Sequence, residues 1–299
     1  MRLRRTGASN ADIQDRRGQR MPGGAVVGGG VGGIATFIIA LLVASGPCSG
    51  AGGGGFSTNG LPSAIDPADI GAPAAPAAPG VTCDTETARL LCDVTSSVQD
   101  FWTAELPPSL GTQYERTQTV FFTGATGTGC GSASSQTGPF YCPADGLVYF
   151  DLDFLGQLQS RFGAQGDFAT AYITAHEYGH HVQNLLGLSR QVTEASQQEP
   201  SRANELSIRL ELQADCLAGV WGASVQDQLD GGDLEEGLNA AAAVGDDQIQ
   251  IATQGRTDPE SWNHGSSEDR VRWFRRGFDS ADPNVCNTFT EDAPISSLG

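Results

Sequence analysis

The residues AHEYGHHVQ (175–183) contain His176, His180 and His181, three of the four histidines in the chain. His176, Glu177 and His180 form an H-E-x-x-H pattern. On a helix, the i, i+4 spacing places two imidazoles on one face, one turn apart, where they can hold one cation. Glu177 then lies beside that cation and can act as a base on a water molecule. The pattern predicts a zinc site with a catalytic carboxylate.

Glu211 and Asp215 form a second i, i+4 pair, in the sequence ELQAD. Two histidines and one glutamate are a common ligand set for catalytic zinc and leave one position open. We therefore predict Glu211 as the third metal ligand. Asp215 is predicted to accept a hydrogen bond from a ligand histidine and to fix its tautomer. The alternative is that both acids lie on a solvated helix face, but the surrounding residues are mostly apolar, which favours partnered carboxylates.

The two remaining histidines have different expected roles. His181 follows His180 and points about 100° away from it around a helix, which predicts a packing or supporting role. His264, in the sequence SWNHGSSEDR, is a candidate catalytic donor to a developing oxyanion. The alternative is a structural histidine in the loop before a helix that Ser266 or Ser267 caps.

Two helices must position these residues. The first is predicted from Phe168 to Leu186, with Asp167 as its cap and Gly187 as its stop. The second is predicted at about 202–226, after Pro200.

The rest of the domain is predicted to mix strands and helices. A helix over 88–106 ends at Pro107-Pro108, strands cover 117–124 and 146–155, and a loop lies between them at 124–138. The cluster from Arg270 to Arg276 predicts a salt-bridged, half-buried helix. Strands followed by long helices are typical of an α+β domain.

The charge of the chain is unevenly divided. The net charge is −18 over 299 residues, but residues 1–20 carry six arginines and two aspartates, so the rest carries −22. Lysine is absent from the sequence. A domain this acidic is a poor match for phosphate backbones, which excludes nucleic acid as an expected partner.

An uncharged run of 21 residues, AVVGGGVGGIATFIIALLVAS, covers 25–45. As a helix it matches the hydrocarbon thickness of a bilayer, roughly 30 Å. We predict residues 1–24 as a cytoplasmic arginine-rich leader, 25–45 as a single transmembrane anchor in the cell membrane, and the domain as extracytoplasmic. A cleavable signal peptide is the alternative, but the run is long for one and no clean cleavage site follows.

Residues 46–82 are rich in Gly, Ala and Pro, which predicts a disordered spacer before a domain at 83–299. The domain contains six cysteines, and an even number in an exported domain suggests disulfides. Six cysteines allow fifteen pairings. Closeness in sequence favours Cys83–Cys92 and Cys130–Cys142, which leaves Cys216–Cys286.

Several blocks together resemble the bacterial neutral zinc metallopeptidase family. They are HEYGHHVQNLLG, ELQADCLAGVW, CGSASSQTGPFYCPADGLVYFDLDF, HGSSEDRVRWFRRGF and the N-terminal DIQDRRG. The resemblance implies a zincin-like fold and a membrane-anchored architecture. It also implies Zn²⁺ on His176, His180 and Glu211, with Glu177 as the catalytic carboxylate. The role of His264 does not come with the resemblance.

The expected function is zinc-dependent endoproteolysis, with a metal-activated water and Glu177 as general base. The substrate is a peptide or protein, which could pair with an edge strand at 146–154. The alternative is a catalytically inactive, zinc-containing module tethered to the membrane for binding or assembly.

Overall fold

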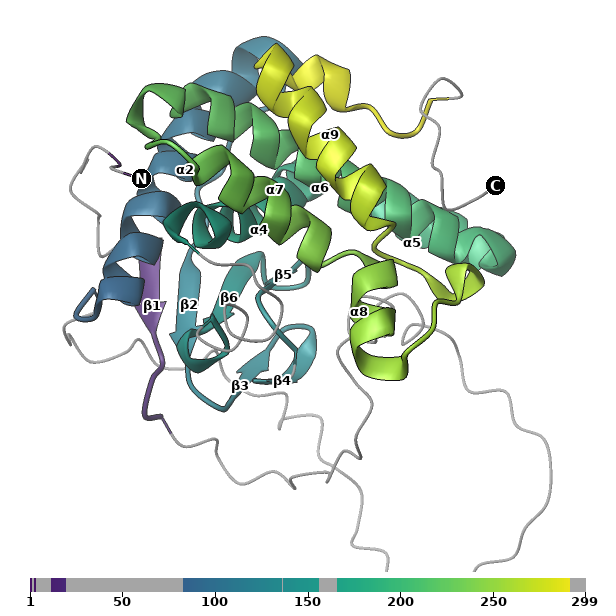
Figure 1. Cartoon of the computed structure of the whole chain (residues 1–299), viewed down its shortest axis with the longest axis horizontal. Coiled ribbons are helices and arrows are strands. Elements are labelled where there is room, and N and C mark those ends of the chain that lie inside the picture. Colours follow the sequence, from purple (N-terminus) through teal and green to yellow (C-terminus); the bar gives the residue numbers. More distant parts are fainter. Residues whose placement is uncertain (2, 4–11, 20–82, 136, 156–165, 291–299) are drawn as a thin grey trace, which may run out of the picture.

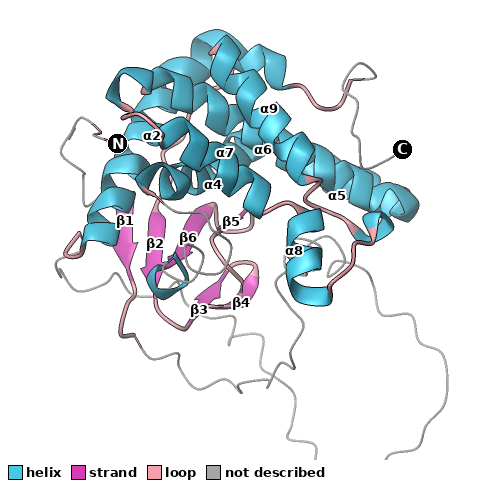
Figure 2. Cartoon of the chain, in the orientation of Figure 1, coloured by secondary structure: helices cyan, strands magenta, loops and turns pink. Residues whose placement is uncertain are grey.

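The computed structural model describes Met1, Leu3 and residues 12–19, 83–135, 137–155 and 166–290. Within these residues, helices gather on one side of a small sheet, and a hairpin lies beyond it (Figures 1 and 2). The strands are β1 Ile13–Asp15, β2 Thr119–Phe122, β3 Ala125–Thr128, β4 Gly131–Ser134, β5 Phe140–Cys142 and β6 Leu147–Asp151. The helices are α2 Glu86–Leu110, α4 Asp167–Leu185, α5 Leu188–Gln198, α6 Ala203–Ser224, α7 Asp233–Ala243, α8 Asp246–Gln254 and α9 Ser267–Ser280. The mixed α+β prediction is confirmed, and α5, α7 and α8 were not predicted.

Helix α2 continues through the two prolines that were predicted to end it. Thr85 caps the start, and its hydroxyl accepts a hydrogen bond from the Ala88 N–H at 3.1 Å. Pro107 and Pro108 lie in the last turn of the helix. Neither has an N–H to donate to the carbonyl four residues earlier, but those carbonyls belong to Thr103 and Ala104, which are exposed to solvent. The helix ends at Gly111, whose φ of 71° suits glycine. The predicted stop was therefore wrong by one turn.

The four-stranded sheet has the order β1-β2-β6-β5. β1, β2 and β6 are parallel, and β5 pairs with β6 in the antiparallel direction. The prediction of an edge strand at 146–154 was wrong, because β6 has a neighbour on both sides. β5 is the edge that contacts α4.

The predicted loop at 124–138 contains the antiparallel hairpin of β3 and β4. The Cys130–Cys142 disulfide ties this hairpin to β5, and the Gly129 N–H donates to the Asp145 carboxylate at 2.7 Å. These links order a Gly/Ser-rich stretch that has little apolar surface to bury. The other disulfides are Cys83–Cys92 and Cys216–Cys286, so the favoured pairing is confirmed.

Strand β1 belongs to the segment that was predicted to be a separate leader. It pairs with β2 in the register Ile13↔Thr119, and Ile13 is buried in the main core. The separation of residues 1–24 from the domain is therefore wrong for residues 12–19. The predicted anchor at 25–45 and spacer at 46–82 lie outside the described residues. Among the residues that are described, no helix is long and apolar enough to cross a membrane.

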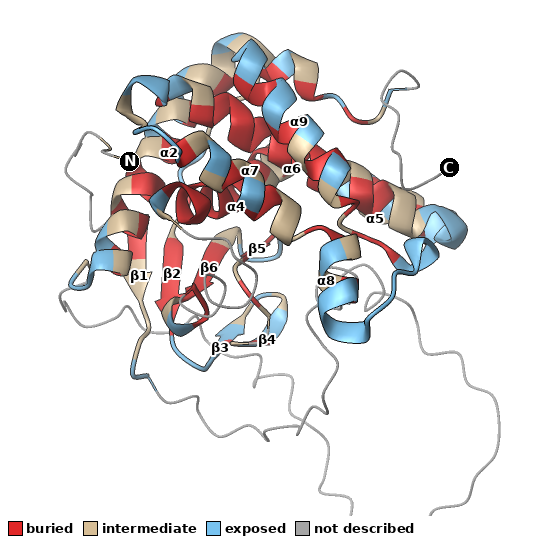
Figure 3. Ribbon diagram, in the orientation of Figure 1, coloured by how far each residue is buried: buried red, intermediate tan, exposed pale blue. Residues whose placement is uncertain are grey.

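Helices α4 and α6 form the centre of the molecule and are buried on nearly every side (Figure 3). They approach closely at Gly179, where a Cβ would lie 3.0 Å from the Ala214 main chain. α6 and α9 meet at Gly219 and Gly277, where an added Cβ would overlap main-chain oxygen of the facing helix. α4 begins at Asp167 after the N-cap Gly166, so the predicted cap at Asp167 was wrong by one residue.

Candidate active site

The predicted ligand residues come together between α4 and α6. The Nε2 atom of His176 lies 3.2 Å from the Glu211 carboxylate, and that of His180 lies 3.4 Å from it. One ligand atom from each of the three side chains lies within 4.8 Å of the others. His176 and Glu211 are buried, and His180 is half-buried. The i, i+4 spacing on α4 therefore places both imidazoles toward the same carboxylate, which comes from the neighbouring helix.

Two buried atoms at this point have no hydrogen-bond partner among the described residues: His180 Nε2 and Glu211 Oε1. Burial opposes ionisation of Glu211, but the neighbouring His180 and His176 outweigh it and hold the pKa of this carboxyl well below its usual range. Two imidazole nitrogens and one ionised carboxylate oxygen, aimed at one point, are donors that zinc prefers. The residues present therefore fit Zn²⁺.

Asp215 is fully buried one turn after Glu211 and contacts His176 as predicted. Its Oδ1 atom lies 2.8 Å from His176 Nδ1. Burial alone would lower the pKa of His176, but the Asp215 carboxylate outweighs it and raises that pKa to about 10. Because the Asp215 carboxylate is an acceptor, His176 Nδ1 donates to it, and Nε2 is turned toward the candidate metal position. A metal ion bound there would replace the second proton, on Nε2, that the raised pKa gives the metal-free ring.

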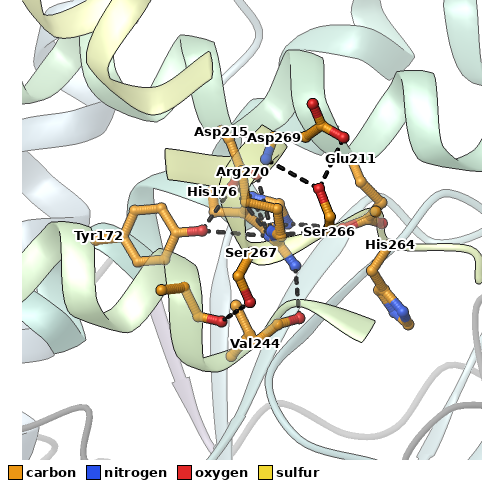
Figure 4. A network of polar contacts seen from close by, with 12 residues as sticks. Tyr172, His176, Glu211, Asp215, Val244, His264, Ser266, Ser267, Asp269 and Arg270 are labelled. Carbon is orange, nitrogen blue, oxygen red and sulfur yellow. Dashed lines mark hydrogen bonds and ion pairs between the residues drawn. The ribbon is translucent and has the colours of Figure 1, made fainter. Parts of the chain in front are cut away.

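Arg270 on α9 belongs to the same network of polar contacts (Figure 4). Its Nε and Nη2 atoms donate to the two oxygens of Asp215 at 2.8 and 2.9 Å. Nη2 also donates to the Tyr172 hydroxyl at 3.2 Å, and Nη1 donates to the Val244 carbonyl at 3.1 Å. The Arg270 side chain is 3% exposed, so this fork is part of the core. The predicted helix is confirmed, but Arg270 itself was not predicted as a site residue.

Comparisons with known proteins show which family the chain belongs to. A family model described as "Putative neutral zinc metallopeptidase" matches residues 1–289. The chain belongs to this family. It is 49% identical over 209 residues to the uncharacterized protein YpfJ of Escherichia coli strain K12, covering 69% of this chain and 72% of the relative. It is 47% identical over 208 residues to the uncharacterized protein Rv2575 of Mycobacterium tuberculosis strain H37Rv, covering 65% and 68%. No solved structure matches.

Glu177 in this family member lies next to His176 and is buried. Burial raises the pKa of its carboxyl, although the two histidines and a main-chain hydrogen bond from Tyr141 oppose the rise. Tyr141 belongs to the edge strand β5. Glu177 is therefore held by the sheet, and its raised pKa lets the carboxyl take up a proton closer to neutral pH than an ordinary glutamate does.

His180 is oriented by Gln183, a residue that sequence reasoning missed. The Gln183 amide oxygen accepts from His180 Nδ1 at 2.8 Å. The amide nitrogen donates to the Leu210 carbonyl at 2.7 Å and to the Gln213 side chain at 3.0 Å, both on α6. These two donations fix the amide orientation, so only its oxygen can face the histidine. The i, i+3 spacing from His180 was the available sequence signal.

We expect Gln183→Met to weaken zinc binding by about tenfold to a hundredfold, because His180 loses the acceptor that sets its tautomer. Gln191→Met, on the exposed face of α5, is the matched control and should bind zinc like the unmodified protein. Competition with a chromophoric chelator measures both affinities. Equal affinities in the two variants would contradict the role assigned to Gln183.

His181 points away from the candidate metal position, as predicted. Its Nε2 donates to the Glu115 carbonyl at 2.7 Å, and its Nδ1 accepts from the Tyr141 hydroxyl at 3.1 Å. Burial lowers the pKa of His181. His181 therefore joins α4 to the sheet as a neutral imidazole.

His264 lies in the loop before α9, and Ser266 caps that helix by accepting from the Asp269 N–H. The loop wraps around Asp246, the first residue of α8. Asp246 accepts main-chain hydrogen bonds from Asn263, His264 and Gly265 at 2.7 to 3.0 Å. Its other oxygen lies 3.1 Å from His264 Nδ1. Burial lowers the pKa of His264, but Asp246 and the nearby Glu211 carboxylate outweigh it and raise that pKa.

Proposed function

We propose that this protein is a zinc-dependent endopeptidase. The observation that carries the proposal is the convergence of His176, His180 and Glu211 on one point, with the buried carboxylate of Glu177 beside it. The family, whose model describes a zinc metallopeptidase, supports the same function. YpfJ and Rv2575 are uncharacterized proteins, so the proposed mechanism rests on the geometry of these residues.

Zinc, when bound, supplies a Lewis acid that polarises the scissile carbonyl and makes water more acidic. Glu177 takes the proton of the attacking water and passes it to the leaving amine. Asp215 holds the proton on His176 Nδ1, and Gln183 does the same for His180, so both ligand nitrogens stay available. The chain thus keeps the metal position fixed while one carboxylate moves the proton.

His264 is the proposed donor to the oxyanion. Asp246 occupies its Nδ1 atom, so an N–H at Nε2 exists only in the protonated ring. The raised pKa of His264 favours that form, and the negative charge of Glu211, a candidate ligand, is one of the causes that raise it. His264 can have both the structural and the catalytic role, because Asp246 holds the main chain of the loop before α9 and also orients the His264 ring.

We expect His264→Ala to lower kcat by roughly 10²-fold to 10³-fold, the cost of losing one oxyanion donor. The loss should be greatest at pH values below the pKa of His264 and should narrow as the pH rises through it, because the ring then loses its Nε2 proton. Rate profiles of both proteins against pH measure this. A loss that is independent of pH would contradict a protonated donor.

The edge strand β5 is the proposed binding site for an extended peptide. Tyr141 is paired with Val148, whose N–H donates to Gln118 on the β2 side. In an antiparallel pair, Tyr141 therefore directs its own main-chain groups away from β6 and toward the free edge. A substrate strand added there would lie beside Glu177, which already contacts Tyr141. This strand replaces the predicted one at 146–154.

The test is elemental analysis of the purified protein followed by cleavage of a peptide library with and without a chelator. We expect one zinc per chain and cleavage that the chelator stops. Zinc without cleavage would favour the alternative of a binding or assembly module, and absence of zinc would contradict both. The three disulfides favour an oxidising, extracytoplasmic compartment. Attachment to the membrane through residues 25–45 stays a prediction.

A further inference from the structure

Strand β1 is an integral strand of the domain sheet. Ile13, Gln14 and Asp15 pair in parallel with residues 119–121 of β2, and the Arg16 N–H continues the ladder to the Phe121 carbonyl at 2.8 Å. The Ile13 side chain is 7% exposed and lies in the main core cluster. Without this strand, β2 would present an open edge.

The charged residues around β1 have partners in the domain. Asp12 is buried and lies 2.6 Å from Arg116, which also contacts Asp100 at 2.8 Å. Arg16 donates to the Gly127 carbonyl at 2.9 Å and lies over the ring of Tyr149. Two of the arginines that suggested a cytoplasmic leader, Arg16 and Arg17, therefore contact residues of the domain.

The residues that come just before and just after the predicted anchor and spacer contact each other. Arg17 Nη1 lies 2.9 Å from the Asp84 carboxylate, one residue after Cys83. The described residues on either side of this segment, Arg17 and Asp84, thus lie side by side. A single crossing of the bilayer would instead separate its two sides by roughly 30 Å.

We infer that the N-terminal segment through Gln19 and the domain from Cys83 onward lie in the same aqueous compartment. A chain that leaves and returns on one side crosses a bilayer an even number of times. The 21 apolar residues at 25–45 have the length for one helical crossing. The single-pass arrangement, with the N-terminus and the domain on opposite sides, is incompatible with β1 in the sheet. The family model also extends over β1, since it matches from residue 1.

Cysteine labelling in intact cells tests this inference. The full chain carries Cys48→Ser, because Cys48 is the cysteine outside the three disulfides, and one reporter at a time: Gln19→Cys or Thr257→Cys, both exposed. A membrane-impermeant maleimide should label both reporters or neither. Labelling of one alone would overturn the inference. Cells opened with detergent provide the control, in which both reporters must react.

A second pair of variants tests whether β1 is docked in the purified full chain. Ile13→Ala removes a buried side chain, whereas Gln14→Ala changes the next residue, which faces the other side of the sheet and is half-buried. We expect Ile13→Ala to lower the melting temperature by about 4 °C or more and Gln14→Ala to change it little. Equal melting temperatures for the two variants would overturn the inference, because a strand outside the sheet has no buried side.

Discussion

Replacement of Glu177 by glutamine is expected to lower kcat/KM for peptide hydrolysis by about 10³-fold to 10⁴-fold while zinc stays bound. An amide of nearly the same volume can still accept the main-chain hydrogen bond from Tyr141 but cannot take a proton from water at neutral pH. The three candidate ligand atoms belong to other side chains. Cleavage of one defined peptide gives kcat/KM, and elemental analysis gives the zinc content.

Glu211→Gln is the matched variant for this experiment, since it makes the same chemical change at the candidate ligand. We expect it to lose zinc and activity together, whereas Glu177→Gln loses activity alone. Full activity of the Glu177 variant would contradict the proposed base. Loss of zinc from that variant with retention by the Glu211 variant would show that the two roles were exchanged.

The predicted residues around the candidate metal position share one property: their roles follow from spacing along a helix. His176 and His180, one turn apart, and Glu211 and Asp215, one turn apart, needed only α4 and α6 to lie side by side. The apolar residues around each pair indicated burial, and buried helices in one domain must pack together. This is why the candidate metal position could be predicted before the fold was known.

The residues that were missed depend on distant contacts that spacing does not encode. Arg270 reaches Asp215 across 55 residues, and Asp246 builds the loop of His264 from 18 residues upstream. The sequence has four arginines between positions 270 and 276, and nothing in their spacing indicates that Arg270 is the buried one. The short β1 strand was missed for a similar reason, because its pairing with β2 joins segments about 100 residues apart, and three residues carry little periodicity.

Arg270 is the missed residue whose removal should cost most. Arg270→Ala is expected to lower the free energy of unfolding of the metal-free protein by about 3–5 kcal/mol, because it leaves the buried carboxylate of Asp215 without its forked partner. Tyr172 and the Val244 carbonyl also lose a donor. Added zinc should recover part of the loss, since a cation at the candidate position offsets negative charge on Glu211, 3.8 Å from the guanidinium.

Arg275→Ala is the matched control, because this arginine lies on the same helix and is exposed. Its unfolding free energy should stay within about 0.5 kcal/mol of the unmodified protein. Arg270→Lys keeps the charge but not the planar fork, so its loss should be intermediate. Urea unfolding of all three variants, with and without zinc, measures these differences. If Arg270→Ala and Arg275→Ala were equally stable, the buried network around Asp215 would not hold α4, α6 and α9 together as the geometry indicates.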